Sequence, residues 1–400
     1  MGLFRRPTQI SVPRQTSIRA YTKRLRWKSQ VFGPMYTGDS VAEWSNLQAV
    51  IPMTSALAAT GGFSFTGSDI GGFTGNPNAE LYTRWFQLSA ATSAFFRLHS
   101  DIHSPQRDPW FYDETTLERL KNATLDRVRS DISEALPEAI RSLVVSNPVN
   151  RHLRYRLLPY WYHAFARYVY YGEPVIRPLW YAHIDDPNTY KCNSPGCDSV
   201  IDQQVLVGTD IMVRGVVEEG AKSVKVYFPL GTQWYSTTGE LMSSGWQDVG
   251  VIMDDIPRYF RAGSIIPRKD TYRSSSRLMY NDNYTLYVYV DPESFSAEGY
   301  AYLDDTISYN STDEDKHNFW KFTFENGNLK VSPGEGSGHY PICIERVVPI
   351  GVTDHSHSQS TGGAGGARKA SHGGAEIVVE IPTESSCVPP KTSRNFRIHL

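Results

Sequence analysis

The chain has 400 residues, of which 40% are hydrophobic, and its formal net charge at pH 7 is -2. This length can bury two or three cores, and the near-neutral charge gives no reason to expect nucleic acid or an anionic membrane as a partner. No run of eighteen apolar residues occurs, so we predict no membrane span.

The segment before Asp39 contains eight lysine and arginine residues and no acidic residue. Organelle transit peptides share this Arg-rich, acid-poor composition, whereas a secretory signal needs an apolar region after the charges, and none follows. We favour the simpler interpretation for residues 1–31, which is a disordered tail or a mis-started reading frame.

A short strand is predicted over Val31–Tyr36, and Asp39 follows it directly. Ser40 and Glu43 match the capping-box pattern, in which each side chain satisfies the other's backbone donor at a helix start. Apolar residues at helical spacing then predict a helix over residues 41–51. Asp39 therefore lies at a strand-to-helix junction, where a lone Asp is most often a structural cap.

A second strand–loop–helix unit follows. Phe63–Thr66 is a β-favouring run, and Asp69 comes just past its end. Asn78 is a good N-cap for a helix whose apolar residues recur from Leu81 to Phe95. Parallel sheets and barrels carry their chemistry at the carboxyl ends of several strands, so two successive strand ends with an Asp favour a shared site.

The next stretch, residues 101–150, is polar and is predicted to be an insertion with an amphipathic segment near Ser133–Val145. An aromatic-rich helix is then predicted over Leu153–Val169, closed by Gly172. Glu173–Trp180 has the pattern of one more strand.

From about residue 189 onward the pattern is that of an all-β protein. Ser223–Phe228 and Leu286–Val290 alternate, and Trp320–Val331 predicts a hairpin with its turn at Asn326-Gly327. Thr353–Gly374 is rich in Gly, Ser and His, a composition more typical of a disordered loop than of a metal site.

Four cysteines in 400 residues are too few for a disulfide scaffold. Cys192 and Cys197 flank a Ser-Pro-Gly turn, and the sequence leaves two alternatives open for them: a small loop disulfide in an oxidising compartment, or two unpaired surface thiols. Further zinc ligands are not visible nearby, so we predict no metal site and no cofactor.

These elements predict an α/β part followed by an all-β part. Residues 32–188 would form the C-terminal part of a (β/α)8 barrel, residues 189–270 a proximal β-sandwich and residues 271–400 a distal β-sandwich. Roughly three strands cannot close an eight-stranded barrel, and they leave parallel edges open. We therefore expect the barrel to need strands that these residues do not supply.

Six stretches resemble one enzyme family. They are TGDSVAEW at 37–44, FTGSDIGGFTGNPNAELYTRWFQL at 65–88, FRLHS at 96–100, EPVIRPLW at 173–180, GTDIMV at 208–213 and RAGSIIPR at 261–268. In this order they resemble glycoside hydrolase family 31, from about Phe32 to Leu400. The resemblance is strongest to members that trim α-linked glucose from N-glycans in the endoplasmic reticulum.

Family 31 enzymes are retaining, so one carboxylate attacks the sugar and a second one protonates the leaving oxygen. The resemblance implies that Asp39 is the general acid/base. It also implies that Tyr36, Asp69, Phe73 and His99 line the sugar subsite. Tyr36 stands where the family usually has Trp, and it still offers a ring for stacking.

The chain also departs from the family pattern. The nucleophilic Asp of the family lies in a WxDMNEP-type motif, which does not occur in this sequence. Val31 replaces a sugar-binding Arg, and Ser40 replaces the Asn that follows the acid/base. Two functions stay open: an α-glucosidase-type retaining hydrolase whose activity needs more than this chain, or a non-catalytic remnant that binds carbohydrate or a partner.

The resemblance further implies an α-glucoside or an N-glycan oligosaccharide as the substrate, a regulatory β subunit as a partner, and the lumen of the endoplasmic reticulum as the compartment. Sequons at Asn122, Asn283 and Asn310 fit the secretory route. The chain as printed has no signal peptide, so its compartment stays open.

Overall fold

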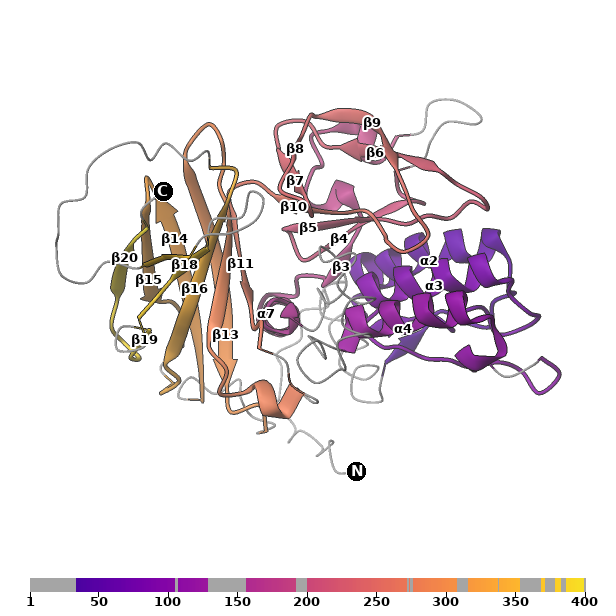
Figure 1. The fold of residues 1–400 in the computed structure, drawn as a ribbon, viewed down its shortest axis with the longest axis horizontal. Coiled ribbons are helices and arrows are strands. Elements are labelled where there is room, and N and C mark those ends of the chain that lie inside the picture. The colour runs from indigo at the N-terminus through magenta and orange to yellow at the C-terminus, as the bar shows by residue number, and fades with distance from the viewer. Residues whose placement is uncertain are drawn as a thin grey trace, which may run out of the picture.

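The structure is a computed structural model. It describes residues 34–104, 107–128, 156–191, 200–271, 273, 276–307, 316–336, 338–352, 368–370, 378–382 and 386–398. In Figure 1 the helices α2, α3 and α4 lie on the right, a six-stranded sheet lies beside them, and a ten-stranded sheet lies on the left. Helix α7 lies between the helical part and the ten-stranded sheet.

The α/β part contains much more helix than strand. Its strands are β1 (Met35–Tyr36), β2 (Thr66–Gly67) and β3 (Ile176–Arg177), and its α-helices are α2 (Trp44–Ala56), α3 (Ala79–Thr92), α4 (Glu114–Val128) and α7 (Leu158–Tyr171). This part also contains a π-helix at Leu57–Gly61 and short 3-10 turns at Pro109–Phe111, Leu179–Tyr181 and Pro187–Thr189. Strands β1 and β2 are parallel, as barrel neighbours are.

The predicted helix over residues 41–51 is confirmed, but its predicted capping box is wrong. Helix α2 begins at Trp44, and Glu43, at its N-cap, makes no side-chain capping bond. Ser40 lies outside the helix, because its carbonyl accepts backbone bonds from Phe73 and Thr74 at 2.7 and 2.9 Å. Hydrogen bonds to a distant loop therefore hold Ser40 outside the helix, where it does not act as the local cap.

The other helices follow the sequence more closely. The Asn78 side chain accepts from the Leu81 N–H at 2.8 Å, which confirms the N-cap of α3. Gly172 closes α7 with a φ of 74°, in the left-handed region that favours glycine. Helix α4 lies within the predicted insertion and was not anticipated, while Ser133–Val145 falls outside the described residues.

The second region is built on a sheet with the order β3-β4-β5-β10-β7-β8, beside a two-stranded sheet β6-β9. Its strands are β4 (Gln204–Val207), β5 (Ile211–Arg214), β6 (Ser223–Phe228), β7 (Trp234–Ser236), β8 (Leu241–Met242), β9 (Gly245–Gly250) and β10 (Arg258–Arg261). The predicted strand at 173–180 is only two residues long, because a 3-10 turn begins at Leu179.

The ten-stranded sheet comes from the C-terminal part of the chain, and a 3-10 turn at Ser276–Met279 lies between its first two strands. Its strands are β11 (Ser264–Arg268), β12 (Tyr284–Tyr289), β13 (Ser296–Asp304), β14 (His317–Glu325), β15 (Asn328–Pro333), β16 (Ile342–Ile350), β17 (Arg368–Ala370), β18 (Val378–Glu380), β19 (Cys387–Val388) and β20 (Arg394–Arg397). The predicted hairpin is confirmed as β14–β15, and Asn326 and Gly327 have φ of 46° and 79°.

The predicted domain boundaries remain predictions. Strand β3 pairs with β4 across the boundary at 189, and β11 pairs with β12 across the one at 271. Within the loop predicted at 353–374, residues Arg368–Ala370 instead form β17, which pairs with β18.

The sequence did not anticipate the disulfide between Cys343 and Cys387. These two residues face each other on the antiparallel strands β16 and β19, so the bond links the C-terminal segment to the sheet. Cys192, Cys197 and Asn310 lie outside the described residues, and the loop disulfide remains a prediction.

An aromatic interface joins α7 to the ten-stranded sheet. His163 of α7 lies 5.9 Å from both the Tyr300 and the Phe319 rings, measured between ring centroids. Tyr170 contacts His317, and the Tyr162 hydroxyl donates to both oxygens of Asp304 at 2.7 Å. The α/β part therefore packs on the ten-stranded sheet through α7.

This interface predicts a pH dependence of stability. Burial, and then the Arg167 charge, lower the pKa of His163 from 6.5 to about 3. In the unfolded chain this histidine takes up a proton near pH 6.5, whereas in the folded protein it stays neutral down to a lower pH. The free energy of unfolding therefore decreases as the pH falls below 6.5. Between pH 7 and 5 we expect wild type to lose about 2 kcal/mol more unfolding free energy than His163→Phe. Denaturant titrations measure this, with His99→Gln, an exposed site, as the control; parallel curves would contradict it.

Candidate active site

The two predicted acidic residues lie at the carboxyl ends of neighbouring strands. Tyr36 of β1 pairs with Gly67 of β2, so Asp39 and Asp69 both follow strand ends on the same side of the parallel pair. A further parallel bridge joins Asp69 to Arg97. Carboxyl ends of parallel strands are the place where α/β enzymes assemble their sites.

The loops after these strands are interlocked by their backbones. The Ala42 N–H donates to the Thr74 carbonyl at 2.8 Å, next to the two bonds that the Ser40 carbonyl accepts. Gly72 lies at the centre of this contact with a φ of 84°, and a Cβ there would lie 2.7 Å from the Ala42 nitrogen. Glycine at this position lets the two loops approach closely.

Replacing Gly72 by Ala should therefore destabilise the site. Gly231→Ala is the matched control, because Gly231 has a similar φ of 74° but nothing within 4 Å of an added Cβ. The control should cost about 1–2 kcal/mol for its left-handed backbone. Gly72→Ala should cost at least about 2 kcal/mol more, since the clash is with backbone atoms. Equal losses in denaturant titrations would contradict the interlocked loops.

Asp69 is a buried carboxylate with spare hydrogen-bonding capacity. Its side chain is 0% exposed, and the Arg97 Nε lies 3.2 Å from one of its oxygens. Neither oxygen has a well-aligned hydrogen-bond donor within the described part of the chain. Burial raises the pKa of Asp69, and the charges of Arg97 and His99 oppose this rise. Such a group gains most from a ligand that donates hydrogen bonds.

Tyr36 connects the two carboxylates. Its hydroxyl donates to Asp39, and the Arg97 guanidinium lies over its ring, 5.0 Å from the centroid. Burial, and then the bond to Asp39, raise the pKa of Tyr36 above its usual 10.0, so the phenol stays a donor at neutral pH. The result is a connected series: Asp39, Tyr36, Arg97 and Asp69.

Phe73 and His99 form the rim of the site. Their rings lie 5.2 Å apart, Phe73 is half-buried and His99 is exposed. The structure thus brings Tyr36 together with Asp39, and Phe73 with His99. Asp69 joins the first group through Arg97. The chemical roles of these five residues stay predictions.

Sequence reasoning missed two arginines. Arg97 lies two residues before His99 in the FRLHS stretch, where its position offered a signal. Arg107 is 5% exposed and donates to the Gly72 and Gly75 carbonyls, so it supports the loop that carries Phe73. No local pattern marks Arg107, because its partners lie about 30 residues away in sequence.

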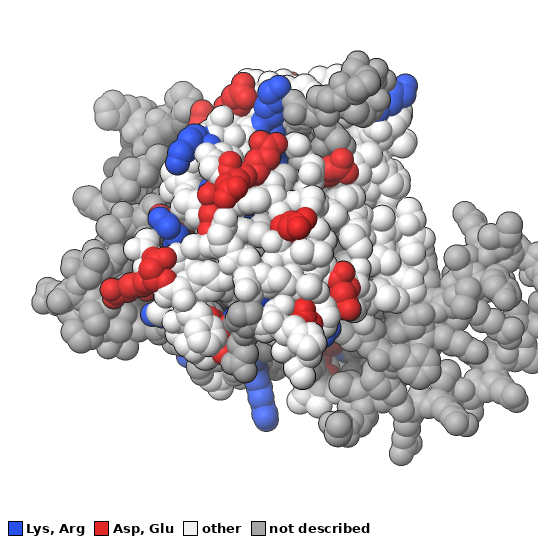
Figure 2. All heavy atoms as spheres, turned by 90° about the vertical axis from the view of Figure 1, so that its right-hand side faces the viewer, with Lys and Arg blue, Asp and Glu red and all other residues white. Residues whose placement is uncertain are grey.

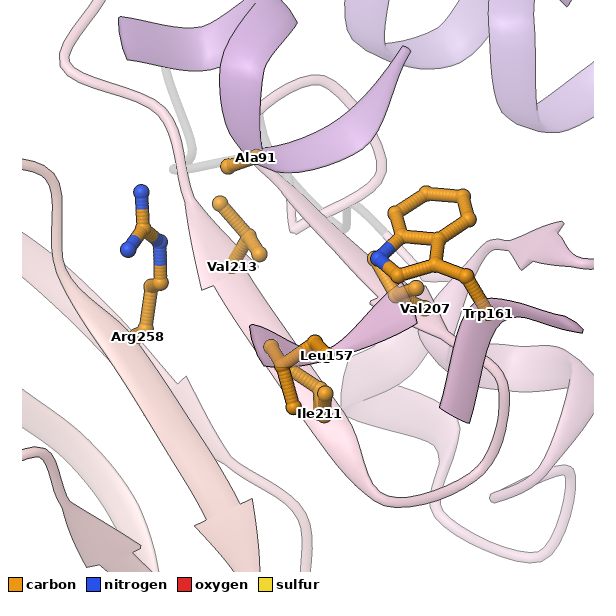
Figure 3. Close-up of a pocket in the computed structure, with 7 residues that line it drawn as sticks. All are labelled: Ala91, Leu157, Trp161, Val207, Ile211, Val213 and Arg258. Atoms are coloured by element: carbon orange, nitrogen blue, oxygen red, sulfur yellow. The ribbon is translucent and has the colours of Figure 1, made fainter. Parts of the chain in front are cut away.

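A cavity lies elsewhere, between α3, α7 and the six-stranded sheet. Figure 3 shows its lining by Ala91, Leu157, Trp161, Val207, Ile211, Val213 and Arg258. Its volume of about 10 Å³ has room for roughly one water molecule, so it is no sugar site. Within the described ranges no three His, Cys, Asp or Glu side chains gather as metal ligands, and no helix is long and apolar enough to cross a membrane.

Comparisons with known proteins agree with this architecture. The sequence matches the profile "Glycosyl hydrolases family 31 TIM-barrel domain" at residues 22–130 and the profile "Glycosyl hydrolase family 31 C-terminal domain" at residues 172–266. It is 34% identical over 336 residues to "Probable glucan 1,3-alpha-glucosidase" of Oryza sativa subsp. japonica, covering 82% of this chain and 32% of that protein.

The chain is also 34% identical over 329 residues to "Neutral alpha-glucosidase AB" of Homo sapiens, covering 81% of this chain and 31% of that protein. It thus spans about a third of the length of the curated relatives it matches.

Solved structures share the fold. The glucosidase II alpha subunit in its alpha3-Glc2-bound form superposes with a TM-score of 0.71 at 24% identity, over 93% of this chain and 38% of that one. A heterodimeric ER glucosidase II, described as a catalytic subunit with the binding domain of a regulatory subunit, gives a TM-score of 0.71 at 25% identity and the same coverage. These likenesses confirm the predicted fold class: the C-terminal part of a (β/α)8 barrel followed by β-sandwich domains.

Proposed function

Because this chain belongs to glycoside hydrolase family 31, we propose that it carries the acid/base and sugar-binding side of an α-glucosidase active site. The observation that supports this best is the connected series Asp39, Tyr36, Arg97 and Asp69 at the ends of two parallel strands. Asp39 at one strand end suits the proton transfer of glycoside hydrolysis, and Asp69 at the neighbouring strand end suits hydrogen bonding to the sugar.

In the proposed reaction Asp39 protonates the leaving glycosidic oxygen and later removes a proton from the attacking water. Its exposed position gives leaving group and water access to it. The Tyr36 hydroxyl holds one oxygen of Asp39 and leaves the other for the substrate.

Asp69 holds the glucose in this proposal. Its buried oxygens lack well-aligned donors among the described residues, and sugar hydroxyls would supply them. The Arg97 charge opposes the rise that burial causes in the pKa of Asp69, Phe73 presents a ring to the sugar, and His99 adds a further hydrogen bond. The covalent step needs a nucleophilic carboxylate, and none of the 400 residues lies in the family's nucleophile motif.

The relatives suggest a finer assignment. We propose α-linked glucose of N-glycans or related α-glucosides as the substrate, since a neighbour of this fold was solved with alpha3-Glc2. A regulatory β subunit as partner and the lumen of the endoplasmic reticulum as compartment are proposed on the same basis, from the heterodimeric ER enzyme.

A second function is favoured by one observation, the missing nucleophile motif. On that alternative the chain is a non-catalytic module that binds carbohydrate or a partner. The first function and the carbohydrate-binding form of the second both require Asp69 to bind sugar, whereas only the first requires Asp39 to transfer a proton.

Binding of the iminosugar 1-deoxynojirimycin to the 400-residue chain tests the shared requirement. We expect weak binding, in the millimolar range, because the barrel wall is incomplete. Asp69→Asn should weaken it about tenfold or more, since a charge-assisted bond is lost. Asp248→Asn, which removes an exposed charge from β9, is the control and should change nothing. Calorimetry or NMR titration measures the affinity, and equal binding by Asp69→Asn would contradict the site.

A further inference from the structure

Two large aromatic side chains next to the candidate site are turned toward solvent. Trp110 is 67% exposed and Phe111 is 64% exposed, on a 3-10 turn at Pro109–Phe111. Their ring centroids lie 6.5 Å apart. Contiguous exposed apolar surface marks interaction sites, whereas single exposed apolar residues are ordinary.

Hydrogen bonds from the residues on both sides hold this turn in place. Before it, Arg107 donates to the carbonyls of Gly72 and Gly75. After it, the Tyr112 hydroxyl donates to the Pro77 carbonyl at 3.0 Å, and its ring lies 5.0 Å from that of Tyr82. Both anchors fasten the turn to residues 72–77, the loop that carries Phe73 of the candidate site.

We propose that Trp110 and Phe111 form a second sugar-binding platform, which holds a glycan residue beyond the glucose that is cleaved. The inference rests on the proposed function and extends it to the rest of the oligosaccharide. The C–H face of a pyranose packs on an aromatic ring as an apolar surface. Spacing of 6.5 Å between centroids lets the two rings contact one sugar ring or two consecutive ones.

The charges around the platform favour a neutral, hydroxyl-rich ligand. Asp108, Asp113 and Glu114 flank the two rings, and carboxylates are good acceptors for sugar hydroxyls. They would repel an anionic lipid surface or a nucleic acid. Figure 2, which shows the end of the molecule formed by α2, α3 and α4, has more acidic than basic side chains in view.

The test is an NMR titration of the full 400-residue chain with α-1,3-linked glucotriose and, separately, with glucose. The reporters are the Trp110 indole N–H, identified by its loss in Trp110→Phe, and the His99 ring, identified by its loss in His99→Gln. We expect glucotriose to shift both reporters and glucose to shift His99 alone. Phe111→Ala should weaken glucotriose binding about three- to tenfold. Trp246→Ala, which removes a 41% exposed ring on β9, should leave the affinity unchanged.

The possible results distinguish the platform formed by Trp110 and Phe111 from the proposed function. If glucotriose shifts His99 but not Trp110, the platform is overturned and the proposed function stands. If neither reporter moves, both fail. A Trp110 shift caused only by the binding domain of a regulatory subunit, and by neither sugar, would make this surface a protein interface and overturn the platform.

Discussion

The 400-residue chain should hydrolyse p-nitrophenyl α-glucoside no faster than buffer does. Retaining hydrolysis passes through a covalent glycosyl-enzyme, so without the nucleophile the pathway itself is absent. Supplying the upstream half of a family 31 barrel, fused to this chain or expressed beside it, should restore turnover by a factor on the order of 10⁵ or more.

The control uses the same upstream half with its nucleophilic Asp replaced by Ala. That pairing rebuilds the barrel wall without the covalent step, so it should fold and stay inactive. Hydrolysis by the 400-residue chain alone, lost in Asp39→Asn, would contradict this prediction and require a second catalytic carboxylate within the chain.

In the completed enzyme, Asp39→Asn should separate substrates by their leaving groups. For a disaccharide, kcat/KM should fall about 10³-fold, because the departing sugar oxygen must be protonated. For 2,4-dinitrophenyl α-glucoside the fall in the glycosylation rate should be less than about tenfold, since this leaving group departs without a proton. Steady-state and single-turnover kinetics measure the two effects.

Asp69→Asn provides the matched comparison. Asp69 is proposed to hold the glucose that both substrates share, so its loss should lower kcat/KM for both by similar factors. Equal losses for both substrates in Asp39→Asn would show that Asp39 binds sugar and does not transfer the proton.

Much of the helix pattern was predictable because it depends on local chemistry. Asn78 caps α3 through a bond three residues away, and the Asn326-Gly327 turn needs two left-handed residues, which these types readily adopt. Ser40 failed as a cap for the opposite reason. Its backbone is engaged by Phe73 and Thr74, and a sequence window around Ser40 contains no sign of them.

The candidate site also has features that the sequence could predict and features that it could not. Asp39 and Asp69 could be found from the sequence because each ends a strand before a helix. Their connection could not, because it runs through Arg97 and the Tyr36 hydroxyl, which meet only when β1 and β2 pair. The cross-strand disulfide of Cys343 depends equally on β16 and β19 meeting after a long separation in sequence.

The central claim is that Asp39 is the acid/base of a retaining displacement in the completed barrel. The most direct test is azide rescue of Asp39→Asn acting on 2,4-dinitrophenyl α-glucoside. Without Asp39 the glycosyl-enzyme should accumulate, because water lacks its base, whereas azide attacks without one. We predict faster turnover with azide and an α-glucosyl azide product. No acceleration, or a β-glucosyl azide, would contradict the assignment of Asp39.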